Sequence, residues 1–159
     1  MSEFVIKIVR SEEYTRLGEI MFEAVRSGDS PYTELQRSAW MPRPREGREW
    51  NERLKAQHIL MAQNSDDEIV GFMSLKPDGD EGYVDFAYIL LAARGRGLFR
   101  RLYCEIETQA KAMRFKALST HASLMAHPAF LAMGFEVIKR ESVEFNSAEF
   151  DRYAMFKPL

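Results

Sequence analysis

The stretch RGRGLFRRL, residues 94–102, decides how the rest of this sequence is interpreted. It follows the apolar run YILLAA, residues 88–93, and it leads into LYCEIETQAKAM, residues 102–113, whose apolar positions recur at helical spacing. Glycines therefore alternate with arginines where a strand turns into a helix. Glycine lets a backbone turn tightly and approach a ligand, and the first amides of a helix have no partner inside the helix. Such an elbow is typical of an anion-binding site.

Arginines within the elbow add charge-assisted contacts to the predicted anion site. Arg94, Arg96 and Arg100 are placed to reach phosphate oxygens, so a diphosphate fits both the backbone and the side chains. The sequence lacks the Gly-Lys-Ser/Thr ending of a Walker loop and the third glycine of a dinucleotide fingerprint. The two commonest nucleotide-binding loops are therefore excluded. For each arginine, plain solvation at a helix start is the alternative.

Composition limits the classes to which the chain can belong. Its 159 residues, 46% hydrophobic and 29% charged, predict one globular domain over residues 1–159. The formal net charge of -2 argues against general affinity for nucleic acid. No apolar run has the length of a signal peptide or a membrane span, so no membrane partner is expected. A single cysteine favours a reducing compartment, and we expect a cytoplasmic protein.

The chain predicts one mixed α/β domain. Short turns between consecutive strands favour an antiparallel meander, whereas the strand–elbow–helix–strand unit must join parallel neighbours through a right-handed crossover. The expected strands cover residues 4–9, 58–63, 68–75, 83–91, 116–122, 135–145 and 150–158, and the expected helices lie between residues 11 and 27 and at 32–40, 46–57, 98–113 and 124–134.

The elbow resembles a known family. Arg94 to Leu98 match the Arg/Gln-x-x-Gly-x-Gly/Ala signature of the GNAT superfamily of acetyl-CoA-dependent N-acetyltransferases, with Phe99 in place of the last small residue. ALSTHAS, residues 117–123, and AFLAMGF, residues 129–135, are similar to the fifth strand and the following helix of that superfamily. Within it, the chain most resembles the YafP-type branch, on the basis of Ala39–Trp40, Tyr83 to Asp85, Ala122–Ser123, and Pro128 with Phe130.

The resemblance implies a twisted, mostly antiparallel sheet that is splayed after its fourth strand and flanked by helices. Acetyl-CoA would lie in the opening, with its pyrophosphate on the amides of residues 94–99 and its pantetheine along the fourth strand. The residues that would contact the co-substrate are Tyr88, Ile89, Leu90, Arg94, Gly95, Arg96, Gly97, Leu98, Phe99, Arg100, Ser123 and Phe130.

Acetyl transfer to an amine needs a base for the amine and neutralisation of the departing thiolate. Asp85 is the first candidate base, because burial in an apolar strand makes a carboxylate more basic. Its alternative role is an ion pair with a local arginine. Many family members offer a tyrosine hydroxyl to the thiolate, but the matching position here is Phe130. Tyr153, Ser123 or His121 would then donate the proton, or the thiolate would leave unaided.

The acceptor side is less clearly patterned. Tyr32 and Trp40 fall where the superfamily builds one wall of the acceptor pocket, with Asp85 nearby, although such aromatic residues serve equally well as core. No His, Cys and carboxylate spacing indicates a metal site, so no metal is expected.

The leading functional hypothesis is an N-acetyltransferase that acts on a primary amine of a small molecule or peptide. The first alternative is a catalytically silent acyl-CoA-binding sensor or partner module, which the substitution at Phe130 keeps open. The second is a phosphate-ligand domain of unrelated chemistry. The resemblance also leaves a homodimer open.

Overall fold

A computed structural model of the protein describes residues 3–159. Its elements follow the order that the sequence predicts, with two short 3-10 helices, η1 and η2, added. The strands are β1 Val5–Ile8, β2 His58–Gln63, β3 Ile69–Asp78, β4 Glu81–Val84, β5 Ala87–Ile89, β6 Ala117–Ser123, β7 Glu136–Phe145 and β8 Ala148–Pro158. The helices are α1 Tyr14–Arg26, α2 Glu34–Trp40, α3 Arg48–Lys55, α4 Leu98–Ala112 and α5 His127–Ala132, with η1 at Ser11–Glu13 and η2 at Leu91–Ala93.

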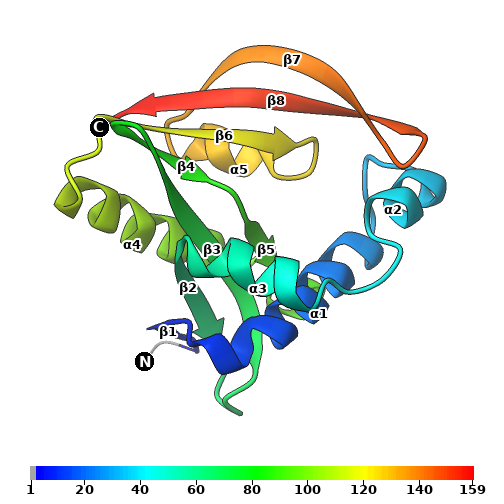
Figure 1. Cartoon of the computed structure of the whole chain (residues 1–159), viewed down its shortest axis with the longest axis horizontal. Coiled ribbons are helices and arrows are strands. Elements are labelled where there is room, and N and C mark those ends of the chain that lie inside the picture. Colours follow the sequence, from blue (N-terminus) through cyan, green and yellow to red (C-terminus); the bar gives the residue numbers. More distant parts are fainter. Residues whose placement is uncertain (1–2) are drawn as a thin grey trace.

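One twisted sheet carries all of these strands in the order β1-β2-β3-β4-β6-β8-β7, and β5 pairs with β3 (Figure 1). Strands β4 and β6 are parallel, and the other pairs are antiparallel. The predicted mixed α/β class and mostly antiparallel sheet are therefore confirmed. In the chain, β4 precedes the elbow and α4, and β6 follows them. The strand–elbow–helix–strand unit therefore joins two parallel neighbours, as predicted.

Alternating side chains of β2 and β3 build two separate cores, one on each face of the sheet. Leu60 and Met73 join the core beneath α4 and α5, while Met61 and Phe72 join the core beneath α1 and α3. This alternation follows from the two-residue period of a strand and explains why residues 59–62 of β2 and 69–75 of β3 are buried without interruption. None of the helices in residues 3–159 has the length and apolar character that a membrane crossing requires.

The predicted strand 83–91 is broken into β4 and β5 at residues 85–86. The Thr120 hydroxyl donates to the carbonyl of Val84 at 2.8 Å, at the end of the parallel pair. The backbone amide of Phe86 donates to the Ser74 hydroxyl at 2.9 Å, and the amide of Ser74 donates back to the Phe86 carbonyl at 2.9 Å. From this point β4 stays with β6 while β5 pairs with β3 alone, so the sheet opens between β5 and β6.

A long hairpin of β7 and β8 covers the open side of the sheet (Figure 1). Its turn places Asn146 and Ser147 in the left-handed region, at φ 49° and 64°. Side chains from the region of α2 hold it: Tyr32 donates to the carbonyl of Asp151 at 2.6 Å and Gln36 to that of Glu149 at 2.6 Å. The hairpin and α2 therefore form one continuous wall.

Substitution of Ser74 by alanine is expected to lower the free energy of unfolding by about 1–3 kcal/mol, because the buried amide of Phe86 loses its acceptor. Exposed Ser65 on the β2–β3 turn supplies the matched control, and Ser65→Ala should change stability by less than about 0.5 kcal/mol. Chemical denaturation of both variants measures the difference. Equal stabilities would show that Ser74 does not hold the break between β4 and β5.

Candidate functional site

The elbow has the backbone that its glycines predict. Gly95 and Gly97 both have φ of +76°, in the left-handed region where a side chain is strained, and α4 begins directly after Gly97. A Cβ atom added at either glycine would meet nothing within 4 Å. The two glycines therefore form an open surface that a ligand can approach closely.

Six consecutive amides at this elbow are left without a partner. The first helical hydrogen bond of α4 runs from the amide of Arg101 to the carbonyl of Gly97, at 3.2 Å. Among the residues that the structure describes, none accepts a hydrogen bond from the amides of residues 95–100. These donors lie at the positive end of the α4 dipole, and the elbow is therefore built to receive an anion.

The arginines of the elbow have different roles. Arg94 donates from Nε to the carbonyl of Ile89 at 2.9 Å and from Nη2 to that of Ala24 at 3.1 Å, so its guanidinium joins β5 to the end of α1. Arg96 pairs with Glu3 at 2.9 Å on the surface. The phosphate contact expected from the Arg94 side chain thus gives way to a bond within the protein. Exposed Arg100 makes no hydrogen bond within the described chain and stays available.

The open edge of β5 faces the elbow. The amide of Leu90 donates to the carbonyl of Val70 at 2.8 Å, so the main-chain groups of Leu90 and, by alternation, Tyr88 are directed toward β3. Those of Ala87 and Ile89 are therefore directed away from β3, into the opening. The carbonyl of Ile89 is taken by Arg94, which leaves its amide free to bind an extended ligand.

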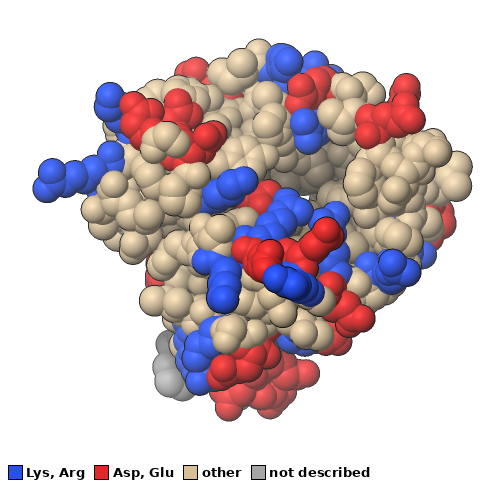
Figure 2. Space-filling model, in the orientation of Figure 1, with Lys and Arg blue, Asp and Glu red and all other residues tan. Residues whose placement is uncertain are grey.

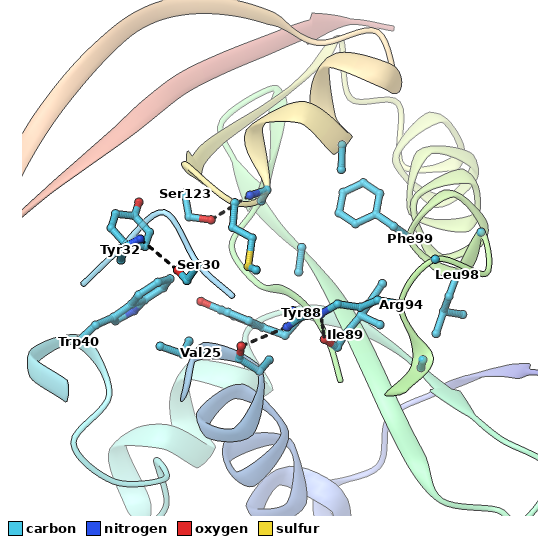
Figure 3. A pocket seen from close by; sticks show the side chains of 18 residues that line it. Val25, Ser30, Tyr32, Trp40, Tyr88, Ile89, Arg94, Leu98, Phe99 and Ser123 are labelled. Atoms are coloured by element: carbon cyan, nitrogen blue, oxygen red, sulfur yellow. Dashed lines mark hydrogen bonds between the residues drawn. The ribbon is translucent and has the colours of Figure 1, made fainter. Parts of the chain in front are cut away.

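A cavity of about 250 Å³ joins the elbow, the edge of β5 and the start of α5 (Figure 3). Ten of the residues predicted from sequence line it: Tyr32, Trp40, Tyr88, Ile89, Arg94, Gly95, Gly97, Leu98, Phe99 and Ser123. Ala24 and Val25 of α1, with Met125, Ala126 and Ala129, add apolar walls that the sequence did not indicate. Eight of the twelve residues predicted to contact the co-substrate therefore share one cavity, whereas Leu90, Arg96, Arg100 and Phe130 do not line it.

A second cavity, of about 490 Å³, lies beyond Tyr32, Trp40 and Ser123, which line both cavities. Its remaining lining comes from the segment before α3, from α3, from β6 and from the hairpin, and consists of Arg45, Arg53, His121, Val143, Glu144, Phe145, Phe150 and Arg152. Tyr32 and Trp40 thus stand between two adjoining cavities, one beside the elbow and one beneath the hairpin.

Asp85 lies at the break between β4 and β5 and forms an ion pair with Arg53, which corresponds to its alternative role, an ion pair with an arginine. Its carboxylate accepts from Arg53 at 3.0 Å on one oxygen and at 3.1–3.2 Å on the other, and from Gln57 at 2.7 Å. The side chain is 11% exposed, and it does not line either cavity. These bonds position Arg53, which does line the second cavity.

The three candidate proton donors are placed differently. Ser123 lines both cavities, and its hydroxyl accepts from the amide of Ala126 at 3.1 Å. Tyr153 stacks on His127 with ring centroids 3.9 Å apart and accepts from Arg140 at 3.1 Å, outside both cavities. His121 lines the second cavity, with Nδ1 2.7 Å from the Tyr83 hydroxyl. Burial, and then the charge of Arg152, lowers the pKa of His121 below its ordinary value.

Phe99 and Phe130, the two positions at which the sequence departs from the family pattern, pack against each other. Phe130 is buried, and its ring meets that of Phe99 edge to face at a centroid distance of 5.2 Å. Phe99 thereby bridges the start of α4 and α5 instead of blocking the elbow. Phe130 is a core residue that does not line the cavity, and its contact with the co-substrate remains a prediction.

Two functional groups were missed by sequence reasoning. The Tyr88 side chain extends from β5 across the first cavity toward Trp40 (Figure 3), with ring centroids 6.5 Å apart. Burial raises the pKa of Tyr88 above its ordinary value, so its hydroxyl stays protonated. Arg45 enters the second cavity from the segment before α3. The sequence named Tyr88 for its backbone alone, and nothing in its pattern distinguished Arg45 from its neighbours.

Known proteins resemble this chain in sequence pattern and in fold. Residues 29–156 match the family model of the acetyltransferase (GNAT) domain. No curated protein matches the sequence. A GCN5-related N-acetyltransferase from Rhodopseudomonas palustris, whose description also carries the words "Aminotransferase, Class-II", superposes with a TM-score of 0.88 at 24% identity. That match covers 100% of this chain and 98% of the other.

Two further solved structures that resemble this chain are complexes with coenzyme A or acetyl-CoA. PaiA N-acetyltransferase from Thermoplasma acidophilum, in complex with coenzyme A, has a TM-score of 0.74 and 18% identity over 100% of both chains. A phosphinothricin acetyltransferase from Sinorhizobium meliloti, in complex with acetyl-CoA, has a TM-score of 0.74 and 19% identity, over 99% of this chain and 89% of that one. At these identities the likeness establishes the shared fold.

Proposed function

The chain belongs to the acetyltransferase (GNAT) domain family, and we propose that it transfers an acetyl group from acetyl-CoA directly to a primary amine of a small molecule or peptide. The observation that carries the proposal is the row of unpartnered amides at residues 95–100, beside the open edge of β5. Both features border the first cavity. A single domain over residues 1–159 would hold the whole reaction.

The elbow fits the diphosphate of coenzyme A. Its amides are unpartnered, and the open faces of Gly95 and Gly97 leave room for phosphate oxygens against the backbone. Exposed Arg100, in the first turn of α4 and without a partner among residues 3–159, would add a cation at this end of the helix. The coenzyme A and acetyl-CoA complexes among the fold neighbours support this assignment. We therefore assign the pyrophosphate to the amides of residues 95–100.

The edge of β5 suits the pantetheine arm, which carries amide groups. The main-chain groups of Ala87 and the free amide of Ile89 are directed into the opening, so they are better placed than the groups of Tyr88 and Leu90 to pair with it. When bound, acetyl-CoA supplies the reactive thioester. The second cavity admits the amine, and Tyr32, Trp40 and Ser123 stand where the two cavities adjoin.

Tyr88 is the hydroxyl that we assign to the departing thiolate. It is protonated, it lines the first cavity, and it comes from the strand that would hold the pantetheine. Ser123, at the junction of the cavities, is a second donor. This assignment answers the question raised by Phe130, because the proton donor need not come from α5.

Two groups remain as candidates for the base. His121 lines the second cavity, and its lowered pKa keeps the ring neutral near pH 7, able to accept a proton from the amine. Asp85 would act through Arg53, which holds its carboxylate. We favour His121, because it lines the second cavity whereas Asp85 lines neither cavity.

The finer sequence predictions stay open. Membership of the YafP-type branch and a cytoplasmic location remain predictions. A homodimer also remains one, and the exposed Val137 and Ile138 on edge strand β7 favour it. The alternative of a silent acyl-CoA sensor would keep the elbow and lack turnover, which an amine screen with acetyl-CoA decides.

Gly97→Glu is expected to weaken coenzyme A binding by at least about 100-fold, because it places bulk and negative charge where the pyrophosphate would lie. Gly79→Glu is the matched control, since Gly79 also has a positive φ, of 64°, and open space around its Cβ position, on the β3–β4 turn. Titration calorimetry measures affinity, and thermal melts correct for backbone strain. Undiminished affinity in Gly97→Glu would refute the placement of the diphosphate.

Tyr88→Phe is expected to lower kcat by about 100-fold while leaving coenzyme A affinity unchanged, because only the donated proton is lost. The comparison variant is Tyr153→Phe, which removes a hydroxyl outside both cavities and should keep kcat within about twofold. Steady-state kinetics on the same amine reads both. A fall in kcat for Tyr153→Phe alone would return the donor role to the residue named from sequence.

A further inference from the structure

The second cavity has an unusual balance of charge. Three arginines line it, Arg45, Arg53 and Arg152, whereas the acidic residue of its lining, Glu144, is exposed. Figure 2 shows blue side chains gathered around the hollow near the centre of this face, with acidic ones among them. Which of these cations are already neutralised decides what the cavity can bind.

Two of the three arginines are neutralised within the protein. Arg53 is held by Asp85, and Arg152 pairs through Nε with Glu141 at 2.8 Å. Arg45 forms no ion pair with any residue in the described range 3–159. Of the three guanidinium groups, only that of Arg45 is therefore left without an ion-pair partner in the part of the chain that the structure describes, and the acidic residue of the lining, Glu144, is exposed and does not pair with it.

Arg45 is held in place although its charge is not matched. Its carbonyl oxygen occupies the position that a Cβ at residue 18 would need, so the backbone of Arg45 packs directly on Gly18 of α1. The side chain is half-buried, and burial followed by the charge of Arg53 lowers the pKa of Arg45. A guanidinium that loses hydration without gaining a counter-ion is destabilising unless a ligand supplies the anion.

The other walls of the cavity are aromatic. Trp40 and Phe150 meet at a centroid distance of 6.1 Å, and Tyr32 contacts both rings edge to face. An apolar side chain can pack on this cluster while a charged group reaches Arg45. The cavity thus offers one cationic anchor and one apolar surface, adjoining the place where the thioester would lie.

From this geometry we propose that the acceptor is an amine carrying one carboxylate, an amino acid, whose carboxylate is bound by Arg45. The inference rests on the proposed acetyltransferase function and specifies its substrate class. A planar guanidinium pairs with a carboxylate through two parallel hydrogen bonds, and a single unmatched cation matches a monoanion better than a phosphate dianion. Polyamines, which are cationic, are disfavoured by the same charge.

The test compares the twenty standard L-amino acids with their amides, together with spermidine, as acceptors for acetyl-CoA, with release of coenzyme A as the readout. At least one amino acid should exceed its amide at least tenfold in kcat/KM, even though the less basic amine of the amide is intrinsically easier to acetylate. Arg45→Gln should abolish this preference. It should lower kcat/KM for the amino acid at least tenfold, while kcat/KM for the corresponding amide and the affinity for coenzyme A keep their values.

Arg43→Gln is the control, because Arg43 is exposed and lies outside the second cavity; it should keep the preference for the acid. Equal turnover of acids and amides, a preference for spermidine, an unaltered preference in Arg45→Gln, or turnover of spermidine or the amides without turnover of any amino acid would each overturn the inference alone. Binding of coenzyme A without turnover of any acceptor would overturn the proposed transfer and favour the silent sensor. Failure to bind coenzyme A would overturn the proposed function as well.

Discussion

The site depends on two buried hydroxyl groups, those of Ser74 and Thr120, at the fork of the sheet, the break at residues 85–86 where β4 and β5 separate. Thr120 ends the parallel pairing of β4 and β6 by binding the carbonyl of Val84, and Ser74 satisfies the amide of Phe86 where the chain changes partners. Without these bonds the break would leave polar groups unpaired in a core that is otherwise apolar. Because the break is satisfied, β5 can leave β6 and present one free edge beside the elbow.

The elbow and the fork act together. An unpaired helix start receives an anion, and an unpaired strand edge receives an extended chain; here both border one cavity. Arg94 fastens them to each other, since it bonds the carbonyl of Ile89 on β5 and that of Ala24 at the end of α1. The positive potential at the elbow therefore comes from backbone dipoles and from Arg100, and the two glycines leave the backbone open, whereas Arg94 and Arg96 are paired within the protein.

Local sequence was sufficient for the elements and for the elbow, because strand alternation, helical spacing and glycine punctuation are local signals. The break at Asp85 and Phe86 was not foreseen, since residues 83–91 read as one continuous apolar strand and the groups that break it come from Ser74 and Thr120. Roles that depend on distant partners were also missed. Arg94 bonds Ala24, 70 positions away, so this role is not visible as a spacing. An ion pair of Asp85 with an arginine was foreseen as an alternative, but its partner Arg53, 32 positions away, could not be identified from the sequence.

The most direct test of this account is amide-resolved hydrogen exchange with and without coenzyme A. The account predicts that the amides of residues 95–100 and of Ile89 exchange rapidly in the free protein and are slowed by the ligand. The amides that pair β7 with β8 should be unaffected. Protection of residues 95–100 before any ligand is added, or exchange there that coenzyme A does not change, would contradict it.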